Sequence, residues 1–445
     1  MTLELDSIAI ADCRQWLAAL PDACADSCVT DPPYEIGFMG KKWDNSGIAY
    51  SADVWRNVLR VLKPGGYVMA FGGSRTYHRL ACAIEDAGFE IRDMVEWFYG
   101  EGFPKSHDVG KTIDKAADAK REKIAPLAKP ATPKAGTFNQ SYNDGYITAP
   151  ATDAAKQWQG WNLALKPAHE PICMARKPFA GTAADNVLRH GTGAINIDAC
   201  RIGREDGDRT EYGIPGGEGS KKQVACFGEF GKAEYSPAVG GRYPANLILD
   251  EAAGAMLDAQ SEGSVHGAGH ARKGAAISKK TPPNMFHNGH ETGDMHRFGD
   301  TGGASRFFYC PKATREEKER GLQGFTESAV NDGREKDIDN AYQRGVTERR
   351  NTHPTVKPLA LMRYLVRLVT QPGGIVLEPF AGSGTTCMAA VIEDMHFIAC
   401  DQSAEYVAIA TARVEWARQK ALTRDEGVIF SKQTGERLAQ QKKLL

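Results

Sequence analysis

One tetrapeptide combines groups that could act on an amino nitrogen. Asp31-Pro32-Pro33-Tyr34 directly follows the apolar run 27–30. Two consecutive prolines cannot continue a central β-ladder and they fix φ, so we expect a strand to end here in a stiff turn. The Asp31 carboxylate and the Pro32 carbonyl could accept both N–H bonds of an exocyclic amino group and favour a pyramidal nitrogen, while Tyr34 stacks on the base. An ordinary Asp-Pro-Pro turn is the alternative interpretation.

A glycine-rich turn near the other end of the chain is typical of a nucleotide-type cofactor site. Residues 374–386 read GIVLEPFAGSGTT, an apolar run followed by Gly382 and Gly384. Glycines let the backbone approach a ligand, and the N–H groups of a following helix favour polar or anionic groups. About 20 residues later Asp401 ends the next expected strand, where an acid can bond ribose hydroxyls. Cys387 replaces the third glycine of the dinucleotide fingerprint, which argues against NAD.

The elements expected around these motifs alternate between strands and helices. Such alternation predicts an α/β fold with a doubly wound, mostly parallel sheet, whose ligands bind at the carboxyl ends of the strands. Strands are expected at 7–11, 27–30, 67–71, within 89–98, at 375–377 and at 396–400, with helices at 54–62, 78–87, 359–369 and from about 385.

The glycine distribution divides the chain. Residues 181–303 hold about half of the 47 glycines and lack long periodic segments. We therefore expect residues 1–110 and 346–422 to form one discontinuous domain, interrupted by a loop-rich insertion at 111–345 and followed by a polar tail at 423–445. Two separate small domains are the alternative.

The overall composition excludes several classes of protein. The 445 residues include 55 basic and 56 acidic side chains, for a formal net charge of −1, so any nucleic-acid surface must be a local patch. Ten scattered cysteines without a C-x-x-C pair argue against a disulfide scaffold or a ribbon-type zinc site. No apolar run is long enough to span a membrane, and the N-terminus does not resemble a signal peptide.

Taken together, the two motifs resemble those of the amino-methylating DNA methyltransferases that use S-adenosylmethionine. Asp31-Pro32-Pro33-Tyr34 is similar to the catalytic motif, and residues 379–386 (PFAGSGTT) to the cofactor loop. Asp12 and Asp401 match acids that hold the adenine and the ribose, and residues 353–358 (HPTVKP) match the motif over the methionine end. The family often has Asp where this chain has Glu378, which keeps the carboxylate. The resemblance implies these cofactor-binding residues: Asp12, Thr355, Lys357, Glu378, Phe380, Gly382, Ser383, Gly384, Thr385 and Asp401.

The order of the motifs adds to the resemblance. The catalytic motif precedes the cofactor loop, as in the β group of the family, whose target-recognition region lies between them. The resemblance implies a seven-stranded-type methyltransferase sheet, recognition by residues 111–345, and transfer of a methyl group to adenine N6 in double-stranded DNA with a flipped target base. Cytosine N4 methylation is the alternative within the class; a catalytically silent DNA-binding module and a non-methylating nucleotide-binding enzyme are alternatives of other classes.

Further expectations concern partners and individual segments. We expect no metal and no membrane association, and a location in the cytoplasm of a bacterial or phage-infected cell. A homodimer and a cognate restriction endonuclease stay open. Five histidines between 266 and 296 are interpreted as a solvated or DNA-facing loop, and residues 158–171 are expected to pack on the core. The histidines are His266, His270, His287, His290 and His296.

Overall fold

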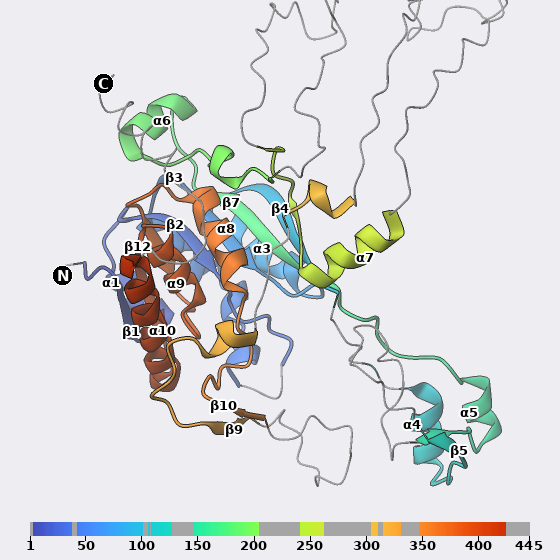
Figure 1. The fold of residues 1–445 in the computed structure, drawn as a ribbon. Helices are drawn as coiled ribbons and strands as arrows, with labels where there is room; N and C mark the ends of the chain where they lie inside the picture. Colours follow the sequence, from blue (N-terminus) through green and yellow to red (C-terminus); the bar gives the residue numbers. More distant parts are fainter. Residues whose placement is uncertain are drawn as a thin grey trace, which may run out of the picture.

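The computed structural model describes residues 3–37, 42–100, 106, 108–126, 146–203, 241–261, 304–309, 315–330 and 347–423. An eight-stranded sheet runs through the centre of the fold, in the order β1-β12-β11-β2-β3-β7-β4-β8 (Figure 1). Its strands are β1 (Ser7–Ile10), β2 (Ala25–Thr30), β3 (Leu62–Phe71), β4 (Glu90–Phe98), β7 (His169–Arg176), β8 (Leu247–Leu249), β11 (Ile375–Glu378) and β12 (His396–Asp401).

Neighbouring strands are parallel except where β7 is inserted antiparallel between β3 and β4. The centre of the sheet pairs β11 with β2, through Val376 with Ser27 and Leu377 with Cys28. From β11 the chain proceeds to β12 on one side, and from β2 to β3 on the other. This reversal is the topological switch point at which open α/β sheets bind ligands. The two motifs follow these two strands directly.

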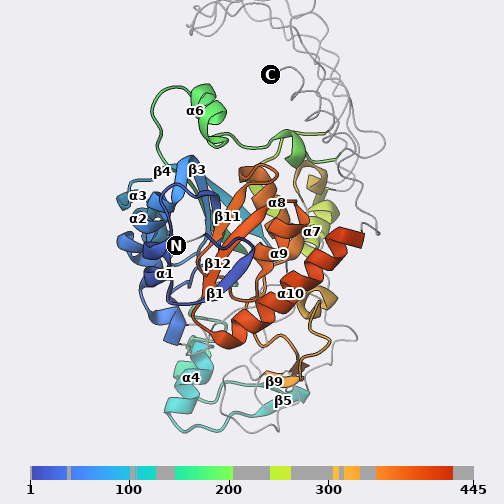
Figure 2. The same cartoon turned by 90° about the vertical axis from the view of Figure 1, so that its left-hand side faces the viewer.

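Helices cover both faces of the sheet, and Figure 2 shows the sheet between the two layers. The first layer is α1 (Cys13–Ala19), α2 (Ala52–Val61) and α3 (Tyr77–Asp86); the second is α8 (Leu359–Val369), α9 (Thr385–Ile392) and α10 (Ala404–Thr423). Each helix packs on the sheet through an apolar face, as α2 illustrates. Its residues Val54, Trp55, Val58 and Val61 recur at helical spacing and are all buried. Alternate residues of the strands face the two layers, as Cys28 and Val29 do, so each layer closes its own apolar core.

The α/β fold with a mostly parallel sheet is confirmed. Strands from both flanks lie in this sheet, which also includes strands from between them. Strands β7 and β8 come from within 111–345 and occupy an inner and an edge position. The run Ile172–Ala175 in β7 is buried on both sides of the sheet, which explains its continuous apolar character. The implied seven-stranded sheet has an eighth, three-residue strand.

The rest of the described chain between 108 and 350 forms peripheral elements. An arm projects from the body (Figure 1) and is built from α4 (Val109–Ala116), β5 (Lys123–Pro126), β6 (Tyr146–Thr148) and α5 (Asp153–Gln157). Outside this arm, the peripheral elements are the helices α6 (Ala183–His190) and α7 (Glu251–Ser261) and a small sheet of β9 (Ser328–Val330) with β10 (Thr347–Arg349). Short 3-10 helices lie at Lys42–Asn45, Ile48–Tyr50, Asp198–Cys200, Ala304–Phe307 and Arg315–Glu319.

Some expectations fall outside these residues. The five histidines between 266 and 296 and the tail from 424 onward are not among the described parts of the chain. Within the described parts, no helix has the length and apolar character needed to cross a membrane.

Candidate active site

A cavity of about 1260 Å³ opens at the carboxyl edge of the sheet, over the switch point between β2 and β11. It is lined by all four residues of the predicted catalytic motif, Asp31-Pro32-Pro33-Tyr34, and by every predicted cofactor residue except Gly384. Residues far apart in the sequence therefore meet in one place. The parallel strands that precede them end at the same edge of the sheet, which is the physical reason.

Asp31 presents one bonded and one unbonded oxygen in this cavity. Its Oδ2 lies 2.8 Å from the Lys357 ammonium nitrogen. Its Oδ1 is buried and has no hydrogen-bond partner among the described residues. Burial raises the pKa of Asp31, although the adjacent Lys357 cation opposes the shift. A buried acceptor without a partner is costly unless a ligand supplies the donor.

The ring of Tyr34 is fixed at both ends. Its hydroxyl donates to Glu170 Oε2 at 2.8 Å and accepts from Lys357 at 3.1 Å. Its backbone carbonyl accepts from the Thr76 hydroxyl at 2.8 Å. Burial raises the pKa of Tyr34 well above its ordinary value, so the phenol stays protonated. The ring is therefore held in one orientation beside Asp31.

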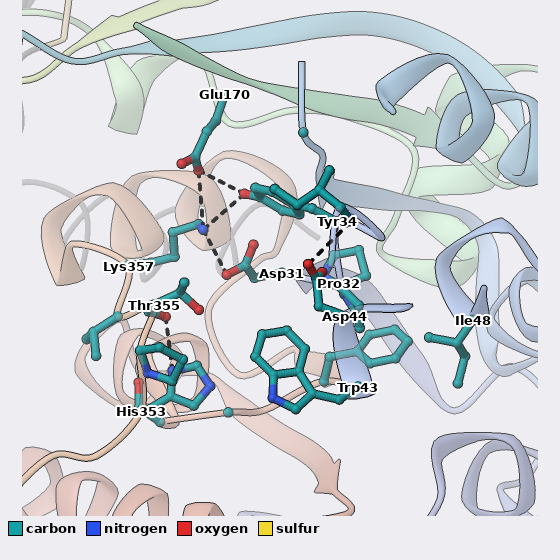
Figure 3. Close-up of a pocket in the computed structure, with 18 of the residues that line it drawn as sticks. Asp31, Pro32, Tyr34, Trp43, Asp44, Ile48, Glu170, His353, Thr355 and Lys357 are labelled. Atoms are coloured by element: carbon teal, nitrogen blue, oxygen red, sulfur yellow. Dashed lines mark hydrogen bonds and ion pairs between the residues drawn. The ribbon is translucent and has the colours of Figure 1, made fainter. Parts of the chain in front are cut away.

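Lys357 lies between Asp31 and Glu170 (Figure 3). Its ammonium nitrogen is 3.2 Å from Glu170 Oε2, and its side chain is about nine-tenths buried. Although burial opposes it, the two carboxylates raise the pKa of Lys357 to about 12. The predicted cofactor residue Lys357 is thus bonded to the catalytic motif and remains charged.

The glycine turn has a backbone that requires glycine. Gly382 and Gly384 adopt φ values of +49° and +74°. A Cβ on Gly382 would lie 2.7 Å from His353 Nε2, and one on Gly384 would lie 2.8 Å from the Ala410 Cβ. Larger residues would be strained and would also clash. Gly384 therefore acts by packing α9 closely against α10, which is why it does not line the cavity.

A buried arginine holds the same turn from behind. Arg413 of α10 is fully buried and donates to the Ser383 carbonyl at 2.5 Å. It also donates to the hydroxyls of Ser383 at 3.0 Å and Thr385 at 3.1 Å. Arg413 was not among the predicted site residues, because nothing in the sequence distinguishes it from the more exposed Arg418 of the same helix.

The three acidic residues predicted to bind the cofactor differ in how far their carboxylates are already bonded within the protein. Asp401 accepts the backbone N–H groups of Gly382 at 2.9 Å and Ser403 at 2.8 Å. Asp12 caps α1 and forms a 2.5 Å ion pair with Arg14. Both line the cavity at the ends of neighbouring strands, β12 and β1.

Glu378 is instead committed to the protein interior. One oxygen accepts from Thr30 Oγ1 and from the Phe380 N–H at 3.0 Å, and the other accepts from Thr386 Oγ1 at 2.6 Å. Burial raises the pKa of Glu378 to about 7. Its carboxyl joins the two motifs to each other.

His353 closes the cavity beside the glycine turn. Its Nδ1 bonds the Thr355 carbonyl at 3.1 Å, and its ring packs edge-on against Tyr406. Burial lowers the pKa of His353 to about 4, so the ring is neutral at physiological pH. Because a carbonyl can only accept, Nδ1 carries the proton and Nε2 faces Gly382.

Two further features escaped sequence analysis. Glu170 was missed because β7 was not predicted; an acidic residue just before a short apolar run was the available signal. The expectation that residues 158–171 pack on the core was wrong for their first part. Trp161 is 59% exposed and Leu165 is 92% exposed, although β7 itself is buried from Pro171 onward.

The chain was compared with known protein families and relatives. A family model described as DNA methylase matches residues 25–212 and 272–412. A type II methyltransferase of Haemophilus influenzae, M.HindIII, is 29% identical over 146 residues, which are 32% of this chain and 37% of that protein. The DNA adenine methyltransferase YhdJ of Escherichia coli is 40% identical over 65 residues, 15% of this chain and 22% of that protein. The chain therefore aligns with well under half the length of these curated relatives.

Solved structures were compared as well. The PvuII DNA methyltransferase, described as cytosine-N4-specific, superposes with a TM-score of 0.40 and 14% identity, covering 95% of each chain. The M1.HpyAVI–SAM complex superposes with a TM-score of 0.35 and 15% identity, covering 92% of this chain and 98% of that one. The family assignment depends on the sequence match, which spans well over half of the residues: the chain belongs to the DNA methylase family.

Proposed function

We propose that this protein transfers a methyl group from S-adenosylmethionine to the exocyclic amino nitrogen of a base in DNA, with adenine N6 as the target. The observation that carries this proposal is Asp31 Oδ1, a buried acceptor without a partner among the described residues, in a cavity shared with the glycine turn. An amino group is a donor of the kind that this oxygen lacks.

The residues present fit the cofactor. Asp401 is placed to accept bonds from ribose hydroxyls and Asp12 from the adenine amino group, since both line the cavity at adjacent strand ends. Gly382 leaves the turn without a side chain, and Phe380 offers an apolar ring at the same edge. When bound, the cofactor supplies a sulfonium-activated methyl group. Because His353 is neutral, it would add no positive charge beside the glycine turn that would hold the cofactor.

The catalytic motif would orient the nitrogen. Asp31 Oδ1 and the Pro32 carbonyl accept its two N–H bonds, and this favours a pyramidal nitrogen whose lone pair is available for attack. Tyr34, fixed by Glu170 and Lys357, provides a stacking surface for the base. Since the methyl donor is already a strong electrophile, catalysis would consist mainly of alignment. The base must leave the duplex because its amino group cannot be reached within the stack.

Adenine is proposed because the family's tetrapeptides that begin with Asp lean toward adenine, and because a curated relative is named as an adenine methyltransferase. Cytosine N4 is the alternative. We further propose that residues 111–345 carry target recognition, that methyl transfer needs no metal, and that the enzyme acts in a bacterial cytoplasm, as its bacterial relatives suggest.

Nucleoside mass spectrometry of DNA from cells that express the protein tests this proposal, with Asp31→Asn as the matched control. N6-methyladenine that depends on Asp31 is the expected result. N4-methylcytosine would establish the alternative base. Unmodified DNA, despite folded protein that binds the cofactor, would overturn the enzymatic function and favour the silent DNA-binding module.

A further inference from the structure

A buried lysine lies between two carboxylates and a phenol behind the catalytic motif. An ammonium group has three N–H donors. Lys357 has three acceptors within reach: Asp31 Oδ2 at 2.8 Å, the Tyr34 hydroxyl at 3.1 Å and Glu170 Oε2 at 3.2 Å. Its nitrogen also lies 4.9 Å from the centre of the Phe71 ring. All three donors are therefore used within the protein.

We propose that Lys357 and Glu170 form a positioning pair, in which Lys357 holds Asp31 ionised with Oδ1 turned toward the target nitrogen and Glu170 holds Lys357 and Tyr34 in place. This inference depends on the proposed function. It assigns Glu170 a role, and it changes the role of Lys357 from a cofactor ligand to a residue that acts through Asp31.

The geometry explains why one oxygen is free. Lys357 forms its ion pair with Oδ2 of Asp31. The Asp31 carboxylate therefore cannot rotate without losing a short ion pair in a buried site, where such a pair is strong. Glu170 accepts hydrogen bonds from the Tyr34 hydroxyl and from the Lys357 ammonium group with the same oxygen, Oε2. The pair therefore couples the acceptor for the amino group to the stacking ring.

Lys357 and Glu170 have opposite effects on the pKa of Asp31. Burial disfavours the Asp31 carboxylate, Lys357 stabilises it, and Glu170 destabilises it by repulsion. Other titratable groups near this cluster are the Tyr34 phenol, Glu378 at the end of β11, Tyr99 after β4, and His353 beside the glycine turn. The two phenols and the imidazole are neutral near pH 7. Glu378 titrates near pH 7 but is common to wild type and all variants, so a difference between them reports the charges of Lys357 and Glu170.

The test is the pH dependence of single-turnover methyl transfer to duplex DNA with labelled cofactor. The acid limb of that profile includes the ionisation of Asp31 together with that of Glu378, so its position is compared among proteins that all retain Glu378. Lys357→Met should move the limb upward by about one to three pH units, the usual effect of a close opposite charge. Glu170→Gln should move it downward. Lys357→Arg restores the charge and should return the limb toward the wild-type position. Cofactor affinity measured by calorimetry should stay within about twofold in all three variants.

A matched control is available near the amino ends of the strands, away from the cavity. Lys63 forms a similar ion pair, 2.7 Å long, with the buried Asp26. Lys63→Met removes a lysine from a carboxylate of β2 without touching the cavity, so its acid limb should not move. A uniform loss of rate at every pH in Lys357→Met, matched by lower thermal stability, would assign Lys357 a merely structural role. If Lys357→Met weakens cofactor binding and leaves the acid limb unmoved, Lys357 is a cofactor ligand and not a positioning residue for Asp31.

A readout without turnover separates this inference from the proposed function. The carboxyl carbon of Asp31 can be followed by ¹³C NMR in protein labelled at aspartate, with its signal assigned by its loss in Asp31→Asn. Its titration should shift upward in Lys357→Met and downward in Glu170→Gln. If these shifts occur in a protein that methylates no DNA, the proposed function fails and the pairing stands. If wild type methylates DNA but neither variant moves the titration, the pairing fails alone.

Discussion

The Thr30 hydroxyl donates a hydrogen bond to the buried carboxyl group of Glu378. Thr30 ends β2, directly before Asp31, and Glu378 ends β11, four residues before Gly382. The same carboxyl accepts bonds from Thr386 and from the Phe380 N–H. One buried side chain thus ties the catalytic motif, the glycine turn and the start of α9 together, and it fixes the two halves of the cavity relative to each other.

The raised pKa of Glu378 predicts an unusual pH dependence of stability. The folded value is about 7, against an ordinary value near 4.5. Between these values the folded chain keeps a proton that the unfolded chain has released. The contribution to the free energy of unfolding is therefore complete below pH 4.5 and is lost as the pH rises through 7, with a slope of at most about 1.4 kcal/mol per pH unit.

Denaturant unfolding of wild type and Glu378→Gln across this range checks the prediction. The neutral amide cannot release a proton, so the stability difference between the two proteins should change by this slope between pH 4.5 and 7. A difference that is independent of pH would contradict the assignment of the raised pKa to Glu378.

His353 should affect the pH dependence of stability in the opposite direction to Glu378. Its folded pKa of about 4 lies below the ordinary 6.5, so its stabilising contribution is complete above pH 6.5 and disappears as the pH falls through 4. Wild type combines both slopes between pH 4.5 and 6.5, and they partly cancel. His353→Asn, measured in the same unfolding series, should lose less stability than wild type on acidification. An equal loss would show that the imidazole is already charged in the folded protein.

Asp31→Asn should reduce the rate of methyl transfer strongly and leave the binding of cofactor and DNA in place. Lys357 would hold the amide oxygen, so the NH₂ group would face the cavity and present donors to the donors of the target amino group. Removal of one preorganised hydrogen-bonding group, measured for the donors of oxyanion holes, costs a factor of about 10²–10³ in rate, and we expect a loss of at least this size. Single-turnover methylation measures this loss, while calorimetry and DNA titration should give near-wild-type affinities. Near-normal turnover would mean that the tetrapeptide is only a turn.

The meeting of the tetrapeptide and the glycine turn in one cavity could be predicted from the sequence, because each motif lies where a parallel strand ends. Strand ends are visible in a sequence as apolar runs stopped by Pro or Gly, and parallel strands bring them to one edge. Glu170 was missed because β7 comes from within residues 111–345, where no strand was predicted, and pairs antiparallel with strands distant in the sequence. Arg413 and the inward-facing Glu378 were equally inaccessible, since hydrogen-bond partners depend on tertiary packing rather than spacing.

Arg413→Met should weaken cofactor binding through the glycine turn. The substitution keeps most of the buried volume and removes the donors to the Ser383 carbonyl and to the hydroxyls of Ser383 and Thr385. An acceptor left buried without a donor costs about 1–3 kcal/mol. Calorimetry should show a weaker cofactor affinity, and thermal unfolding a lower midpoint. Arg418→Met, on the same helix but more exposed, is the control that should leave the affinity unchanged.

The exposed segment before β7 should contact DNA, if bases enter the cavity as proposed. Leu163 and Leu165 line the cavity and are 72% and 92% exposed, an unusual state for two leucines so close together. Apolar side chains beside an extruded base can fill the space left in the stack. Leu165→Ser should therefore weaken binding of duplex DNA several-fold and leave cofactor affinity and thermal stability unchanged, because the side chain supports no core. Leu188→Ser provides a matched control: this leucine of α6 is 78% exposed but does not line the cavity, so DNA binding should not respond. Fluorescence anisotropy with a labelled duplex measures both. Equal DNA affinity in the two variants would place the duplex elsewhere on the protein and would separate the cavity mouth from recognition.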